Sequence, residues 1–515
     1  MGNEIELKLE VSRADARRLP PVLKKFSSGR MQKEKLVSVY YDTAKLALRH
    51  RHAVLRVRRS GEGRLQTIKL DPLGVCGPFG RLEWERELEG MRPDLEGLRK
   101  KDLGGLPIKK YRDDLKPLFE TVVSRQAITL NYEGAELEVA IDNGQVKTGR
   151  KRLPIHEVEV ECKKGDPAAV VSLAKEIAER VKADYGIASK ADRGYRLREG
   201  TAEEAVCERR IALDAKATTG EAFQVVALSC LRHFAGNRAA VIAGEAEGVH
   251  QMRVGLRRLR AALSVFKQML RGPETEGVKT ELKWLTEALG PARDMDVLIR
   301  ETVAPLQKEI AEKRAVVLFK KDVSDRRARN FSRAQAAVAS ERYRKLVLQT
   351  ALWIAGGGWT RTEVDLIVAR RCQKAGAFAA RELHRRTGKI LKKLDRLEKL
   401  NAKKQHKLRI AIKKLRYAAG FFESLFAGVH HRRKNFEKAL KKLQSALGKL
   451  NDIRTHDRLA GDYKKPPRLR RGAAPKAFVM GLIRGKERGR VKKLLARAAK
   501  AGHRLAEAKE FWRGG

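Results

Sequence analysis

Hydrophobic and polar residues alternate in short runs along the first 200 residues of the chain. A period of two is typical of β-strands, because successive side chains of a strand point to opposite faces. Turn-forming sequences such as Ser60-Gly61-Glu62-Gly63 and Asn143-Gly144 separate several of the runs. The pattern predicts eight strands, at 4–9, 36–41, 53–58, 65–70, 81–89, 127–132, 136–141 and 157–162, and two short helices, at 12–26 and 167–183.

The rest of the chain has a different period. Apolar residues recur there at intervals of three and four, which is the spacing of an amphipathic helix. Helices are expected at 220–234, 250–271, 279–300, 367–397, 403–426 and 432–453, and a further one at 487–511, after a basic segment broken by prolines that begins near 464. The chain is therefore expected to be multidomain, with a domain at 1–200, a linker at 201–219 and a helical domain at 220–515.

The helical part contains an internal repeat. His250-Gln-Met-Arg253-Val-Gly-Leu-Arg257-Arg258-Leu-Arg260 matches His406-Lys-Leu-Arg409-Ile-Ala-Ile-Lys413-Lys414-Leu-Arg416 at an offset of 156 residues. Two copies, at about 220–370 and 371–515, predict an all-α bundle with pseudo-two-fold symmetry. For the strand-rich part we expect an α+β domain, in which eight antiparallel strands close into a barrel or tunnel with flanking helices.

Charge narrows the range of partners. The 515 residues include 113 Lys and Arg against 63 Asp and Glu, a net charge of +50, of which residues 1–200 contribute only +10. Such a positive field attracts polyanions, whether nucleic acid, an anionic membrane surface or a phosphate polymer. Five scattered cysteines without a CxxC pair favour a reducing cytoplasm over a disulfide framework or a zinc site. No apolar run approaches the roughly 20 residues of a membrane-spanning helix, and the N-terminus does not look like a secretory signal.

In the predicted strands, charged residues share one face and apolar residues share the other. The charged faces carry Glu4, Glu6 and Lys8; Arg56 and Arg58; Lys69; Glu83 and Glu85; Arg125; Glu138 and Asp142; and Glu157, Glu159 and Glu161. One interpretation is an antiparallel sheet with a solvated face. The other is a barrel whose lumen is lined by these charges. Like-signed carboxylates two residues apart repel one another, and the acidic and basic strands are segregated, so we favour the second interpretation.

A lumen of this kind suits phosphoryl transfer. Carboxylate oxygens are hard ligands for Mg²⁺ or Mn²⁺, and Arg and Lys bind phosphate oxygens. Catalysis of phosphoryl transfer is mostly positioning and neutralisation of developing charge, which this set of residues could provide.

Glu4-Ile5-Glu6-Leu7-Lys8 resembles the ExExK signature of the CYTH, or triphosphate tunnel metalloenzyme, family. It is followed in the family's order by Tyr41-Asp42-Thr43, Leu55-Arg56-Val57-Arg58, Ile68-Lys69, Glu83-Trp84-Glu85, Arg125, Asp142-Asn143-Gly144, Glu157-Val158-Glu159-Val160-Glu161 and Ser189-Lys190. The resemblance implies an eight-stranded tunnel that binds a triphosphate and Mg²⁺ or Mn²⁺. It implies metal ligands at Glu4, Glu6, Glu159 and Glu161. It implies substrate-binding cations at Lys8, Arg56, Arg58, Lys69, Arg125 and Lys190, of which Lys8, Arg125 and Lys190 are the candidate catalytic residues. The roles of Glu83, Glu85, Asp142 and Glu157 stay open.

Each repeat helix carries a basic stripe beside its apolar one. The stripes consist of His250, Arg253, Arg257 and Arg260 in the first copy and His406, Arg409, Lys413 and Arg416 in the second. Few acidic residues lie four positions away to neutralise them, so each stripe repels itself unless an anion binds. The doubled motif resembles the CHAD, or conserved-histidine α-helical, family, which implies a basic groove that binds inorganic polyphosphate.

Together the two halves resemble bacterial CYTH–CHAD inorganic triphosphatases. This implies a cytoplasmic enzyme, associated with polyphosphate granules, that hydrolyses inorganic triphosphate to diphosphate and phosphate. Two alternatives stay open: a non-catalytic polyphosphate-binding protein, and a hydrolase of a nucleoside or thiamine triphosphate. A specific nucleic-acid partner is disfavoured because aromatic residues, which stack on bases, make up only 6% of the chain. No membrane partner is expected, and the oligomeric state stays open.

Overall fold

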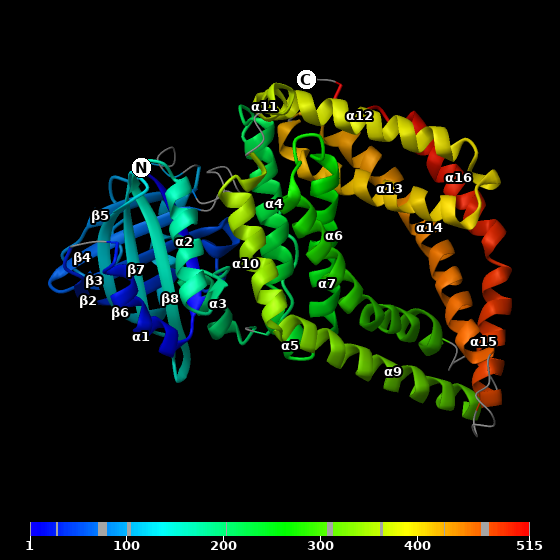
Figure 1. The fold of residues 1–515 in the computed structure, drawn as a ribbon, viewed down its shortest axis with the longest axis horizontal. Coiled ribbons are helices and arrows are strands. Elements are labelled where there is room, and N and C mark those ends of the chain that lie inside the picture. The colour runs from blue at the N-terminus through cyan, green and yellow to red at the C-terminus, as the bar shows by residue number, and fades with distance from the viewer. Residues whose placement is uncertain are drawn as a thin grey trace.

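A computed structural model of the protein describes residues 2–26, 29–70, 80–99, 103, 105–201, 203–305, 313–360, 364–426, 428–464 and 473–513. Within these ranges the side chains of residues 2–5, 80–82, 313, 456–464 and 473–476 are not described. The chain forms a β-barrel at one end of the molecule and a set of helices at the other (Figure 1).

Eight antiparallel strands in the described residues form a closed ring. They are β1 (Gly2–Val11), β2 (Gln32–Asp42), β3 (Ala53–Ser60), β4 (Gly63–Leu70), β5 (Gly80–Glu87), β6 (Lys116–Tyr132), β7 (Ala135–Thr148) and β8 (Lys151–Lys164). The order is β5-β4-β3-β2-β6-β7-β8-β1, and pairing of β5 with β1 closes the ring. A short strand that was not predicted, β9 (Ala183–Tyr185), also pairs with β1. The predicted eight-stranded barrel is confirmed, and β6, β7 and β8 are longer than the alternation indicated.

The apolar faces of the strands point outward and are covered. On β1, β7 and β8, residues such as Leu7, Val139 and Val160 are buried in a cluster with α1 (Arg13–Leu23) and α2 (Ala168–Arg180), the two helices predicted there. On β3 and β4, Leu55 and Ile68 are buried against residues that precede and include the short helix η3 (Ile108–Asp114). Because burial of each such side chain stabilises the fold by about 1.5–3 kcal/mol, the apolar faces are held outward and the charged faces face the lumen.

One end of the lumen is apolar, which the sequence pattern did not predict. The helix α3 (Lys190–Glu199) places Tyr195 among the lumen-facing side chains of Tyr40 and Phe119. Gly194 allows the close approach, because a Cβ atom there would lie 2.0 Å from the Phe119 ring. The helix α3 therefore covers part of one end of the barrel.

The remainder of the chain is helical. The helices are α4 (Thr219–Ala235), α5 (Arg238–Ile242), α6 (Ala246–Val265), α7 (Pro273–Leu298), the π-helical turn η4 (Ile299–Val303), α9 (Lys313–Ala339), α10 (Glu341–Ala355), α11 (Asp365–Cys372), α12 (Ala375–Leu394), α13 (Ala402–Phe421), α14 (His430–Lys464), α15 (Ala473–Arg488) and α16 (Val491–Glu507). The helices α9 and α10 were not predicted, and α15 occupies part of the segment expected to be broken by prolines. The sequence repeat relates α4, α6 and α7 to α12, α13 and α14. No helix in the described part of the chain is long and apolar enough to cross a membrane.

The helix α10 lies between the barrel and the other helices (Figure 1). Arg344 on α10 donates a hydrogen bond to the Ala183 carbonyl of β9 at 2.9 Å. Arg238 on α5 lies 3.5 Å from Asp184 of the same strand. The buried apolar cluster of β1, β7 and β8 continues without a break into α4, α6 and α10. The barrel and the helices therefore share one core. The predicted linker, where described, has no helix or strand before Thr219, where α4 begins.

Candidate active site

A cavity of about 790 Å³ occupies the barrel lumen. Nine of the ten barrel residues predicted to bind metal or substrate line it: Glu6, Lys8, Arg56, Arg58, Lys69, Arg125, Glu159, Glu161 and Lys190. Glu83 and Glu85 line it as well. The tenth residue, Glu4, lies on β1 opposite Arg81, and its side chain is outside the part that the structure describes. Closure of the sheet and the approach of α3 thus bring together residues up to 184 positions apart in the sequence, from Glu6 to Lys190.

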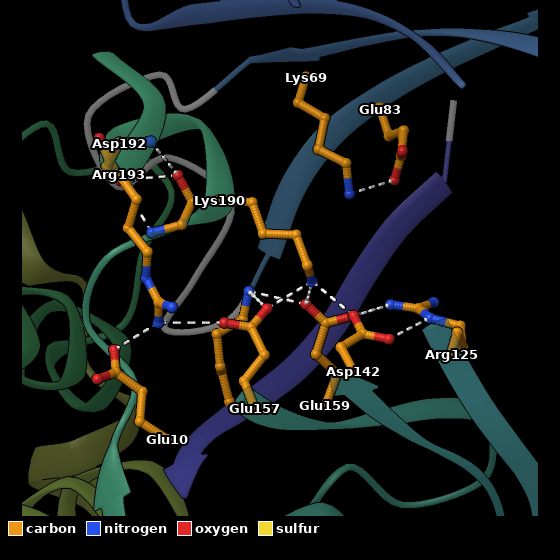
Figure 2. Close-up of polar contacts among 12 residues, drawn as sticks. Glu10, Lys69, Glu83, Arg125, Asp142, Glu157, Glu159, Lys190, Asp192 and Arg193 are labelled. Atoms are coloured by element: carbon orange, nitrogen blue, oxygen red, sulfur yellow. Dashed lines mark hydrogen bonds and ion pairs between the residues drawn. The ribbon is translucent and has the colours of Figure 1, made fainter. Parts of the chain in front are cut away.

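A network of buried ion pairs lies at the centre of the cavity (Figure 2). Lys190, which reaches in from the first turn of α3, places its Nζ 2.7 Å from Asp142 Oδ2 and 2.9 Å from Glu159 Oε1, and it also contacts Glu157. Lys8 Nζ lies 2.8 Å from Glu159 Oε1 and 3.3 Å from Glu157 Oε1. Two lysines from the two ends of the barrel sequence are therefore held by carboxylates of β7 and β8.

Arg125 on β6 completes the network. It donates from Nε to Asp142 Oδ1 at 2.8 Å and from Nη2 to Asp142 Oδ2 at 2.7 Å. Its Nη2 also donates to Glu159 Oε2 at 2.5 Å. A bidentate pair of this kind fixes the plane of the guanidinium as well as its position.

Opposite charges in the network favour the ionised forms of Glu159, Asp142 and Lys8. Burial raises the pKa of Glu159, but Lys190, Lys8 and Arg125 outweigh burial and hold that pKa well below its ordinary value. Burial likewise raises the pKa of Asp142, and Lys190 and Arg125 reverse the shift. The neighbouring carboxylates overcome the effect of burial on Lys8 and raise its pKa.

Two of the residues whose roles stayed open lie beneath the cavity. Asp142 and Glu157 are fully buried and do not line the lumen. Glu157 also lies 3.2 Å from Nη2 of Arg193, which in turn contacts Glu10 at 2.8 Å. These two carboxylates therefore position cations. The sequence could not separate them from lumen ligands, because both share the charged face of their strand.

The opposite wall carries positive charge that the network does not neutralise. Lys69 Nζ lies 3.1 Å from Glu83 Oε2, and Arg56 Nη2 lies 3.8 Å from Glu83 Oε1. The Nε of Arg58 is buried and has no hydrogen-bond partner among the described residues. Burial, together with the nearby Arg56 and Arg125, lowers the pKa of Arg58 to about 10. An anion bound here would relieve this repulsion.

Carboxylates of three neighbouring strands form a row at one side of the cavity. Glu6 on β1 lies opposite Glu161 on β8, and Glu161 lies opposite Glu138 on β7. Lys163 Nζ is 2.8 Å from Glu161 Oε2 and 3.8 Å from Glu138 Oε1. Like charges directly opposite one another are destabilising, and oxygen ligands suit a hard divalent cation. The sequence placed Glu138 on the charged face but gave it no role.

A second acidic group could also hold a metal ion. Among the described side chains, Asp142, Glu157 and Glu159 bring ligand atoms within 4.8 Å of one another. Lysine and arginine side chains already occupy these oxygens, and a metal ion there would have to displace them. Glu159 connects this group to the row that includes Glu6 and Glu161, because its pair with Lys8 is two residues along the same two strands from the pair of Glu6 with Glu161.

The two basic stripes of the helical part lie close together. Arg257 on α6 is near enough to lower the pKa of both Arg409 and Lys413 on α13. Burial, followed by the nearby charges of Arg409 and Arg257, lowers the pKa of Lys413 to about 7. The Nε atoms of Arg253, Arg257, Arg409 and Arg416 are buried and have no hydrogen-bond partner among the described residues. Together these groups form a concentration of positive charge that Asp294 and Asp452 offset only in part.

The remaining stripe residues lie around this centre. Burial and the nearby Arg293 lower the pKa of His250, and His406 Nδ1 lies 2.6 Å from Asn451 Oδ1. Arg253 Nη1 donates to the Thr286 carbonyl at 3.0 Å. Arg260 is exposed.

Comparisons with known proteins agree with this description. Residues 2–195 match the CYTH domain model, and residues 226–460 match the CHAD domain model. Over 199 residues the chain is 31% identical to an inorganic triphosphatase of Haemophilus influenzae; the match covers 38% of this chain and 55%, about half, of that relative's length. Similar solved structures include the CHAD domain of the plant Ricinus communis, with 27% identity, coverage of 58% of this chain and 96% of that one, and a TM-score of 0.49. They also include an adenylyl cyclase candidate from Hippeastrum described as revealing a dominant triphosphatase activity, with 20% identity, coverage of 38% and 96%, and a TM-score of 0.28. The chain is therefore a CYTH domain followed by a CHAD domain, and it is distantly related to the Haemophilus enzyme.

Proposed function

We propose that the barrel hydrolyses inorganic triphosphate to diphosphate and phosphate, and that the helical domain binds inorganic polyphosphate. One observation carries the proposal: carboxylates able to hold a divalent cation and cations able to hold phosphate line the same cavity of the barrel. The relationship to the Haemophilus inorganic triphosphatase supports the choice of reaction.

The chemistry of the acidic residues fits Mg²⁺ or Mn²⁺. The ligands would be Glu6, Glu159 and Glu161, with Glu4 from the same strand face as Glu6. When bound, the metal would supply Lewis-acid activation of the phosphates and of water. These carboxylates are on adjacent, hydrogen-bonded strands, so their positions are fixed before the ion binds.

The cations would divide the work on the substrate. Arg56, Arg58 and Lys69 would hold the phosphate chain, because the positive charge of this wall is only partly neutralised. The cations of the central ion-pair network are Lys8, Arg125 and Lys190. Each would donate hydrogen bonds to the phosphate oxygens on which negative charge develops as the phosphoanhydride bond breaks. Their preorganisation by buried carboxylates means that they need not reorganise during the reaction.

In the helical domain, polyphosphate would bind where the stripes of α6 and α13 approach each other. The proposed ligands are His250, Arg253, Arg257, Arg260, His406, Arg409, Lys413 and Arg416. A polyanion would satisfy the buried guanidinium donors and relieve the repulsion between the two helices.

The test is phosphate release from tripolyphosphate by the purified full chain with Mg²⁺ or Mn²⁺, with ATP and thiamine triphosphate as competing substrates. Glu159→Gln should lower kcat/KM for tripolyphosphate by roughly 100-fold or more, the usual effect of losing a group that stabilises the transition state. Glu179→Gln on the exposed face of α2 is the matched control and should leave it unchanged. If the wild-type protein releases no phosphate from tripolyphosphate, the proposed reaction is wrong.

A further inference from the structure

The lumen cavity extends beyond the residues that a triphosphate needs. Its volume of about 790 Å³ falls in the range of pockets that hold drug-sized ligands, about 300–1,000 Å³. The lining continues from Lys190 past α3 to the short helix η1 (Arg49–Arg51) and to the segment that follows α3. We call this extension the mouth, and its cationic residues are Arg49, Arg196 and Arg209.

The mouth carries three guanidinium groups and also three carboxylates, those of Asp192, Glu199 and Glu204. Arg49 forms an ion pair with Glu199, and Arg209 Nη2 lies 3.7 Å from Asp192 Oδ1. Burial lowers the pKa of Arg196, and the nearby Arg209 and Arg49 add to the shift although the two carboxylates oppose it. The three guanidinium groups thus share the carboxylates of Asp192 and Glu199. The Arg209 side chain is 55% exposed, so it can turn toward a ligand at little cost.

The mouth opens toward the helical domain. A second cavity of about 580 Å³ lies between the barrel and the helices, where its lining includes Leu228 of α4 and Val347 of α10. This cavity and the lumen cavity share the lining residues Arg196, Val206 and Arg209, and also Asp192 of α3. The shared residues place the mouth directly beside the space between the two domains, so a chain that leaves the lumen through the mouth would pass next to the helical domain.

From this geometry we infer that Arg49, Arg196 and Arg209 form a binding subsite for the phosphates of a polyphosphate chain longer than triphosphate. The inference rests on the proposed function. The chain end occupies the lumen and the following phosphates contact the mouth, where guanidinium groups bind phosphate oxygens in bidentate fashion. The protein then shortens long chains from the end. Water supplies an oxygen to the terminal phosphorus, the terminal P–O–P bond breaks, phosphate and a chain shorter by one unit leave, and a proton passes to solvent.

The test compares chain lengths with the full-length protein. Arg209→Gln should lower kcat/KM for a size-fractionated long polyphosphate by about 10-fold, which corresponds to about 1.4 kcal/mol, and should leave kcat/KM for tripolyphosphate within twofold of wild type. Arg17→Gln removes the same charge from an exposed position on α1 and should change neither value. Arg209→Lys, which keeps the charge without the planar fork, should restore part of the loss.

A second variant, Arg257→Gln, should weaken polyphosphate binding between α6 and α13. Combining it with Arg209→Gln separates binding of the polyphosphate by the helical domain from binding at the mouth. The effect of Arg209→Gln on long chains should persist in that background. The inference would be overturned if Arg209→Gln lowered kcat/KM equally for both substrates or for neither. It would also be overturned if the wild-type protein cleaved tripolyphosphate but did not hydrolyse long chains. A wild-type protein inactive on tripolyphosphate would overturn the proposed function instead. Unchanged thermal melting of Arg209→Gln excludes misfolding as the cause of any loss.

Discussion

Replacement of Lys190 by alanine should destabilise the barrel strongly, apart from any effect on catalysis. The Lys190 side chain is only 11% exposed, and its ammonium group is shared by the carboxylates of Asp142, Glu157 and Glu159. Without it, Lys8, Arg125 and Arg193 must balance all of this buried negative charge. The substitution therefore leaves carboxylates uncompensated in a site that water reaches poorly.

The size of the effect follows from the cost of breaking a buried ion pair. Removal of one partner costs about 3–5 kcal/mol. For a domain of about this size, each 1 kcal/mol lowers the melting temperature by about 2–4 °C, so Lys190→Ala should lose about 6–20 °C. The control variant Lys175→Ala removes an exposed lysine from α2 and should change stability by less than about 0.5 kcal/mol.

The assay is thermal unfolding of both variants and wild type, followed by circular dichroism at pH 7 and near pH 5. In wild type, the pKa values of Asp142 and Glu159 are depressed, so their contribution is present above the unfolded pKa and is lost only in stronger acid. In Lys190→Ala the same pKa values should rise above the unfolded ones, so stability returns as the pH falls. The deficit should therefore be smaller near pH 5 than at pH 7. A deficit below about 1 kcal/mol, or one that does not change with pH, would refute the reasoning.

Three other changes have defined outcomes. Gly194→Ala should lower both the melting temperature and the rate of tripolyphosphate hydrolysis, because the added Cβ would lie 2.0 Å from the Phe119 ring. Overpacking of this kind costs about 1–3 kcal/mol, so an unchanged melting temperature would contradict the packing of α3 against Phe119. Polyphosphate affinity, measured by calorimetry, should fall about 10-fold between pH 6 and pH 8, because the pKa of Lys413 is about 7 in the free protein and the bound polyanion favours the charged lysine. The variant Lys413→Gln should bind polyphosphate with an affinity that changes much less with pH. A steep pH dependence in that variant would exclude Lys413 as its source. Glu6→Gln should raise the Mg²⁺ concentration for half-maximal hydrolysis at least about 10-fold in a metal titration, and an unchanged titration would remove Glu6 from the ligand set.

The sequence predicted which charged residues line the barrel lumen because two simple rules act together. Alternation fixes the face on which each charge lies, so Lys8, Arg58 and Glu159 were assigned to one face without knowledge of their neighbours. Closure of the sheet then gives all of these faces a single lumen, so residues on distant strands meet. The repeat on α6 and α13 worked in the same way, since helical periodicity placed Arg257 and Arg409 on equivalent faces.

Other parts of the site could not be predicted from periodicity. The short helix α3 enters the barrel because Tyr195 packs on Phe119, a contact between residues far apart in the sequence. Asp142 has the same alternation as the lumen carboxylates, and only packing shows that it lies beneath the cavity. Arg196 and Arg209 reach the mouth from the end of a helix and from a segment without regular structure, where no repeat marks a face.

The helix α10 has a practical consequence for anyone who wishes to move the barrel into another protein. Its C-terminal end packs on α2, where a Cβ at Gly356 would lie 2.6 Å from Val171, and its N-terminal part is tied to β9 through Arg344. A barrel cut away after α3 would lose this cover and present a fresh apolar wall to water, which invites self-association. A transplantable version must either carry residues 341–356 as a graft or replace Val171 and its neighbours with polar side chains.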